Sequence, residues 1–155
     1  MDKTDNYLLN VDSKAILHIE QYIDGLFLQW SINEIYLANI VTTFANLLHL
    51  ILAQSKDMAV GIATHLKGEV ISFEFTGVDA SVLKLFLKEH HLQDIRDNST
   101  QSVFLIQKIA DEIAVEGENL ILRFNTGALP EAYLDDRKHS LNDYYQNTPQ
   151  KAMND

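Results

Sequence analysis

Residues 35–53, IYLANIVTTFANLLHLILA, decide the fold of this chain. The stretch contains no charged residue, proline or glycine, so it predicts one long and deeply buried helix. At about 100° per residue, its polar side chains fall on one face about 120° wide. Burying an amide or a hydroxyl without a partner costs about 1–3 kcal/mol, so this polar face must line a ligand cavity, form a satisfied network or pack at an interface. The polar residues are Asn39, Thr42, Thr43, Asn46 and His49.

Two shorter elements precede this helix. Residues 7–11 predict a strand, and residues 15–30 carry the apolar spacing of an amphipathic helix. Ser31 and Glu34 are spaced as in a capping box, in which each side chain bonds a backbone N–H at the start of a helix. We therefore expect Ser31 to cap the long helix.

The segments after the long helix alternate between strand and helix patterns. A tight turn at residues 66–68 predicts a hairpin, and the stretch DIRDNSTQS is polar enough for a loop. The expected elements are strands at 58–65 and 69–75, a helix at 82–92, a loop at 94–102, a helix at 103–113 and a strand at 119–124.

The last part of the chain changes character. From about residue 126 it is polar, and it contains both prolines of the protein. We expect one domain at residues 1–125 and a tail at 126–155, which is either partly ordered or forms a short docking helix over residues 131–145.

The charge balance excludes several classes of partner. The 155 residues include 22 acidic and 12 basic ones, giving a net charge of −10. Binding to nucleic acid or to an anionic membrane surface requires clustered Lys and Arg, so we expect neither. The chain has no cysteine and no apolar N-terminal segment, which favours a cytoplasmic protein without a signal peptide. The long helix has nearly the length of a membrane span, but its polar face favours a core helix.

Residues 103–124, VFLIQKIADEIAVEGENLILRF, resemble one known family closely. They are similar to the segment after the nucleotide lid in anti-sigma-factor serine kinases, where an apolar run, an Ala-Asp-Glu motif and an acidic-glycine turn precede a strand ending in Arg-Phe. These kinases belong to the histidine-kinase-type (GHKL) ATPase domains of the Bergerat fold, and the order of expected elements over residues 7–124 resembles that fold. The resemblance implies an α+β two-layer sandwich with a mixed, mainly antiparallel sheet covered on one face by helices.

The long helix resembles the N-box helix of this family, which carries Glu-x-x-x-Asn. The resemblance places Asn46 at the amide that holds magnesium, and Thr42 at the carboxylate that activates the attacking group. A threonine hydroxyl cannot act as a general base near neutral pH, and a single neutral oxygen is a poor magnesium site. Asn46 is therefore the one candidate metal ligand, and we expect no catalytic residue.

Two further motifs of the family are altered. Placing Gly77 on the first glycine of the DxGxG box puts Phe75 where an aspartate would accept the adenine amino proton. Asp79 or Glu74 could replace that aspartate only if the register shifts. The glycine-rich phosphate loop aligns with residues 98–102, NSTQS, whose side chains would obstruct a phosphate cradle.

The sequence thus predicts a scaffold that has lost its catalytic machinery. We expect a regulatory protein-binding module that holds a sigma factor or an anti-sigma-antagonist-like protein, and the resemblance adds self-association as a homodimer. No cofactor is expected, and Mg-ATP would bind only if the site is retained. The alternatives are a nucleotide or small-molecule sensor and an ATP-dependent serine kinase. The candidate cofactor-binding residues are Asn39, Thr42, Asn46, Gly77 and Asp79.

Overall fold

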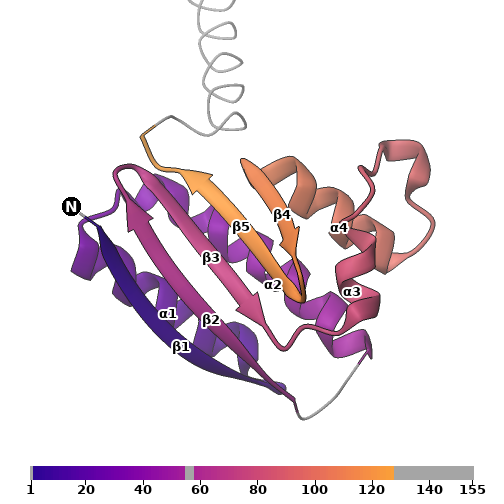
Figure 1. Ribbon diagram of the computed structural model, residues 1–155, viewed down its shortest axis with the longest axis horizontal. Helices are drawn as coiled ribbons and strands as arrows, with labels where there is room; N and C mark the ends of the chain where they lie inside the picture. The colour runs from indigo at the N-terminus through magenta and orange to yellow at the C-terminus, as the bar shows by residue number, and fades with distance from the viewer. Residues whose placement is uncertain (1, 55–57, 128–155) are drawn as a thin grey trace, which may run out of the picture.

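A computed structural model describes residues 2–54 and 58–127. One layer is a five-stranded sheet of order β1-β2-β3-β5-β4, in which every neighbouring pair is antiparallel. The helices cover one face of this sheet (Figure 1). The expected α+β two-layer sandwich is therefore confirmed, with a sheet that is antiparallel throughout the described residues.

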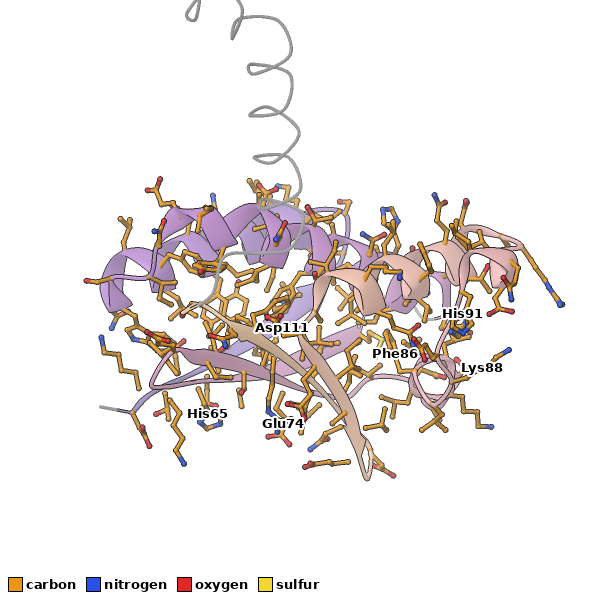
Figure 2. All side chains as sticks on the ribbon, turned by 90° about the horizontal axis from the view of Figure 1, so that it is seen from above. His65, Glu74, Phe86, Lys88, His91 and Asp111 are labelled. Carbon is orange, nitrogen blue, oxygen red and sulfur yellow. The ribbon has the colours of Figure 1, made fainter. Side chains whose placement is uncertain are left out.

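The strands are β1 (Lys3–Val11), β2 (Met58–Lys67), β3 (Val70–Thr76), β4 (Glu112–Glu116) and β5 (Asn119–Asn125). The helices are α1 (Ala15–Trp30), α2 (Leu37–Gln54), α3 (Ala80–Leu85) and α4 (Asn98–Ile109), with single 3₁₀ turns at η1 (Glu34–Tyr36) and η2 (Leu92–Asp94). None of the described helices lies over the opposite face of the sheet, and Figure 2 shows His65 and Glu74 projecting from that face. Strand side chains alternate between the two faces, so the apolar positions form the core under the helices.

Helix α2 is the central element of the helical layer. The ring of its Phe44 meets the rings of Phe73 and Phe75 from β3 edge to face, with centroids 4.7 and 5.2 Å apart. Such aromatic contacts add about 0.5–1.5 kcal/mol to the burial of the rings. The segment Glu34–Gln54 is also long and apolar enough to cross a membrane, a test that the core helix of a soluble protein passes as well.

The polar face of α2 is not buried as a whole. Only Thr43 is buried, and its Oγ1 donates to the backbone oxygen of Asn39 at 2.8 Å within the same helix. Thr42 and His49 are exposed, and Asn46 is half-buried. A helix lying on a sheet buries only the side that faces the sheet, so an uncharged face can still remain open to solvent.

The predicted capping box at Ser31 is wrong. Ser31 ends α1 instead, in the left-handed conformation with φ of 55°, and its N–H bonds the backbone oxygen of Phe27. The chain then enters η1 through Asn33, whose side chain accepts from the N–H of Ile35 at 3.0 Å. An Asn cap two residues later therefore replaces the Ser cap.

Several predicted boundaries need correction after β3. The helix expected at 82–92 begins earlier and already ends at Leu85, and the loop expected at 94–102 contains the first turns of α4. The helix expected at 103–113 ends at Ile109, and the strand β4, which was not predicted, follows it. This strand pairs with β5 along its whole length, which a local sequence pattern of five residues does not reveal.

The other expected elements agree more closely. The helix predicted at 15–30 has those bounds in the structure. The first strand begins earlier, at Lys3, and the hairpin turn is shorter, with Gly68 at φ of 62°. The predicted docking helix at 131–145 lies outside the described residues.

Candidate functional site

The five residues expected at a cofactor site lie on two parts of the structure. Asn39, Thr42 and Asn46 belong to α2, whereas Gly77 and Asp79 belong to the connection between β3 and α3. Among these five, only Asn46 lines the pocket between α2 and α4.

This pocket lies between the C-terminal half of α2 and the N-terminal half of α4, two helices that pack against each other. Its volume is about 620 Å³, and its lining contains no Asp, Glu, Lys or Arg. We call it the α2–α4 pocket. Its lining is Asn46, His49, Leu50, Leu52 and Ala53 from α2, with Asn98, Ser99, Gln101, Ser102 and Leu105 from α4.

Ser102 is the most informative residue of this pocket. It is only 6% exposed, and its hydroxyl makes no hydrogen bond with any described residue. Among the described residues, no fully enclosed side-chain nitrogen or oxygen lacks a partner. The Ser102 hydroxyl therefore reaches the pocket, where a water molecule or a ligand group can bond it.

Asn46 and His49 form the α2 side of the pocket. They are three residues apart and so lie on the same side of the helix. The Asn46 Nδ2 donates to the backbone oxygen of Thr42 at 2.9 Å, which leaves the Asn46 Oδ1 without a hydrogen bond among the described residues. The position assigned to a metal ligand thus faces a pocket without carboxylates, and no cluster of three His, Cys, Asp or Glu side chains that could hold a metal ion occurs in the described parts of the chain.

The N-terminus of α4, which aligns with the phosphate loop of the resemblance, is capped by its own acid. The Asp97 Oδ1 accepts from the backbone N–H of Thr100 at 2.8 Å and from the Thr100 hydroxyl at 2.9 Å. The bonds that Thr100 donates lower the pKa of Asp97, which is therefore ionised at neutral pH. A carboxylate already occupies the helix terminus where an anionic ligand would bind.

Phe75 occupies the position where the resemblance expects the adenine acceptor. The side chain is 3% exposed and packs against Phe44 in the core under the helices. It offers no acceptor, and it fills the space with an aromatic ring.

Gly77 and Asp79, in the connection from β3 to α3, both have structural roles. Gly77 has φ of 85°, and a Cβ at this position would lie 3.1 Å from the backbone oxygen of Ala59. The Asp79 Oδ1 caps α3 by accepting from the N–H of Ser81 at 2.8 Å and from its hydroxyl at 2.6 Å, and these bonds lower the pKa of Asp79. Both residues thus shape a turn and a helix start.

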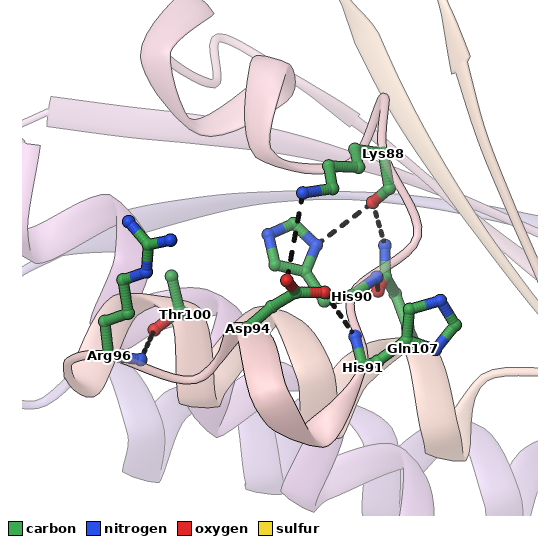
Figure 3. A network of polar contacts seen from close by, with 7 residues as sticks. All are labelled: Lys88, His90, His91, Asp94, Arg96, Thr100 and Gln107. Carbon is green, nitrogen blue, oxygen red and sulfur yellow. Dashed lines mark hydrogen bonds and ion pairs between the residues drawn. The ribbon is translucent and has the colours of Figure 1, made fainter.

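A second feature is the segment of residues 86–97 that connects α3 to α4, which we call the α3–α4 segment. The side chain of Gln107 in α4 accepts from the N–H of His90 at 2.8 Å and donates to the backbone oxygen of Lys88 at 2.9 Å (Figure 3). Asp94 accepts from the N–H of His91 at 2.9 Å and lies 3.9 Å from the Lys88 ammonium group. The segment is therefore fixed by hydrogen bonds to α4 and within itself.

The α3–α4 segment also carries two large apolar side chains that are exposed to solvent. Leu87 is 71% exposed and Leu92 is 73% exposed. Single exposed leucines are common on protein surfaces, but two on one hydrogen-bonded segment give it apolar area that a partner can cover.

Sequence reasoning missed the role of Ser102. The resemblance aligns the NSTQS stretch with a phosphate loop, whereas these residues form the first turns of α4. A usable signal was present, because Ser102 precedes Val103 and lies four residues before Ile106, two positions on the buried side of this helix.

No protein-family model matches this chain, and no curated protein matches it at a significant level.

Proposed function

We propose that this chain is a non-catalytic regulatory module that binds a protein partner, on a scaffold of the Bergerat type. The observation that carries the proposal is the burial of Phe75 against Phe44, where an ATP-binding relative would need an acceptor for adenine. A scaffold whose base-recognition position is part of the hydrophobic core acts through its surface.

Two further positions support the absence of phosphoryl transfer. Thr42 stands where the resemblance requires a carboxylate, and its hydroxyl cannot take a proton from an attacking group near neutral pH. Asp97 places a negative charge at the N-terminus of α4, where phosphate oxygens would have to bind. Each position opposes a different requirement of the reaction.

The α3–α4 segment is the surface we assign to the partner. Its hydrogen bonds to Gln107 hold the backbone in place before binding, so little conformational entropy is lost when a partner docks. Leu87 and Leu92 supply apolar area, and the same segment carries both basic side chains, Lys88 and Arg96, and acidic ones, Glu89, Asp94 and Asp97. The partner we propose, from the resemblance, is a sigma factor or an anti-sigma-antagonist-like protein.

The catalytic part of the proposal is tested with Mg-ATP. Calorimetric titration of the full chain and a phosphate-release assay should both give no signal above buffer. Micromolar binding that depends on magnesium, or release of phosphate, would contradict the proposal and favour the serine kinase alternative.

The partner-binding part is tested by comparing two surface variants. Proteins crosslinked to the full chain in its own cells are identified, and the bound species is then purified and titrated directly. The double variant Leu87→Asp, Leu92→Asp should weaken that binary complex by at least about tenfold, which corresponds to about 1.4 kcal/mol. The matched control Leu28→Asp changes an equally exposed leucine on α1 and should leave the affinity unchanged.

A small-molecule sensor is the second candidate function, and the α2–α4 pocket favours it. The pocket volume lies within the range of about 300–1,000 Å³ that is common for small-molecule sites. Sensing and partner binding are compatible, because α4 both lines the pocket and, through Gln107, holds the α3–α4 segment.

A further inference from the structure

We propose that the α2–α4 pocket binds an uncharged ring compound that carries several hydroxyl groups, the shared chemistry of sugars and nucleosides. The inference concerns the ligand of the pocket, and it stands independently of the protein partner proposed above.

The charge of the ligand follows from the surroundings of the pocket. The lining contains no Asp, Glu, Lys or Arg, and the imidazole of His49 is its single titratable group, so neither an anion nor a cation finds a fixed counter-charge there. The ionised Asp97 at the start of α4 and the net charge of −10 repel anions further. A neutral compound is the class that avoids both penalties.

The hydrogen-bonding character of the ligand follows from the groups that line the pocket. Asn46, Asn98 and Gln101 contribute amides, each able to donate and to accept. Ser99 and Ser102 contribute hydroxyls, which also do both. A ligand that matches such a set presents donors and acceptors side by side, as vicinal hydroxyl groups do.

The buried hydroxyl of Ser102 is the observation that distinguishes this pocket from an ordinary helix N-terminus. The Ser102 side chain is 94% buried, from an exposed fraction of 6%, and its hydroxyl opens to the pocket without a bond to any described residue. Serines in helices often bond the carbonyl four residues earlier, but Ser102 leaves the carbonyl of Asn98 alone. The buried hydroxyl is thus available to a ligand.

The apolar part of the lining completes the match. Leu50 and Leu105 line the pocket from opposite helices, Leu50 being only 2% exposed. The C–H face of a sugar ring, or the flat face of a base, can pack on such side chains while the hydroxyl groups bond the amides.

The test uses the full chain labelled with ¹⁵N and a panel of probes at up to about 10 mM, ten times a 1 mM dissociation constant. The panel contains glucose, ribose, uridine and adenosine, together with the monophosphate of each. At least one neutral probe should produce saturable shifts of backbone amide signals in α2 and α4. Its phosphorylated form should bind at least tenfold more weakly. Saturation by a sugar, by a nucleoside, or by both identifies the source of the hydroxyl-bearing ring.

Two serine variants decide whether the shifts report this pocket. Ser102→Ala should weaken the neutral probe at least fivefold while the spectrum remains that of the folded protein. Ser72→Ala, a matched change on β3 outside the pocket, should leave the affinity unchanged. The proposal is overturned if no neutral probe binds, if a phosphorylated probe binds equally well or better, or if Ser102→Ala binds like the unmodified chain.

Discussion

Replacing Phe75 by alanine tests whether this side chain belongs to the hydrophobic core, the observation on which the proposed non-catalytic module rests. Phe75 is 3% exposed, and its ring lies 5.2 Å from that of Phe44 at an interplanar angle of 72°. Removing a buried phenylalanine side chain costs about 3–5 kcal/mol, because transfer energy is lost and a cavity remains. For a domain of this size each kcal/mol lowers the melting temperature by about 3–5 °C, so we expect a decrease of about 9–25 °C.

The free energy of unfolding is measured by urea titration, followed by circular dichroism and by the fluorescence of Trp30. Trp30 is the only tryptophan and is 7% exposed, so its emission reports the loss of the core. Phe75→Leu retains most of the buried volume and should lose about a third as much stability. The control Leu28→Ala changes a side chain that is 72% exposed and should shift stability by less than about 0.5 kcal/mol.

A loss of less than about 1 kcal/mol for Phe75→Ala would refute the burial of Phe75 in the core, since it would approach the effect of about 0.5 kcal/mol that is usual at exposed positions. Phe75 would then face solvent or an open cleft. The main support for a module without nucleotide binding would disappear with it.

Three further predictions concern backbone conformation and pH. Gly77→Ala should destabilise the fold by about 1–2 kcal/mol, because φ at this position is 85°. Gly25→Ala in α1 should stabilise it by about 0.5–1 kcal/mol, because the added Cβ meets no atom within 4 Å and alanine favours a helix. Equal urea midpoints for the two variants would contradict this prediction. Burial raises the pKa of Tyr22, so the folded state keeps its proton and stability declines above about pH 10; Tyr22→Phe should flatten that decline, and an unchanged slope would exclude Tyr22 as its source. The hydrogen bonds to Asp97 lower its pKa below the ordinary value of 3.8, so they contribute stability above pH 3.8 that is lost as the pH falls through the lowered pKa. The stability of Asp97→Asn should therefore decrease less steeply with acid than that of the unmodified chain. Equal slopes of stability against pH below 3.8 would show that the cap is not formed.

The parts of the fold that could be predicted have strong local patterns. The helix at 15–30 has an uninterrupted apolar spacing, and its bounds agree with α1. Ser31 has the spacing of a cap toward Glu34, but the chain uses it in the left-handed conformation to leave α1. Whether a serine ends one helix or begins the next depends on the path between them, which packing decides.

Strand β4 shows a different limit of sequence reasoning. The run from residue 103 to residue 113 is apolar enough to extend a helix, but the helix ends at Ile109 and Glu112–Glu116 pairs with β5. An edge strand of five residues is stabilised by pairing with its neighbouring strand, and the five residues by themselves do not show that pairing. Its partner is known only once the order of the whole sheet is known.

The candidate site was predictable in its helices but not in its individual residues. The polar face of α2 pointed to Asn46, which lines the α2–α4 pocket. The assumption that the whole face is buried was wrong, because Thr42 and His49 are exposed. The spacing of Ser102 to Val103 and Ile106 places it on the buried side of α4, but the pocket to which it opens exists only because α4 packs against α2.

The contrast between Thr43 and Ser102 separates a structural polar residue from one that can serve a ligand. Both are buried on the two helices that pack together, with exposed fractions of 0% and 6%. Thr43 bonds the carbonyl of Asn39 at 2.8 Å, so its hydroxyl needs nothing from outside. Ser102 has no bond of this kind among the described residues, and its hydroxyl opens to a pocket whose lining contains no Asp, Glu, Lys or Arg. The hydrogen bonds that a pocket can offer a ligand come from the polar groups that its own helices leave unbonded, and here these are hydroxyl, amide and imidazole groups.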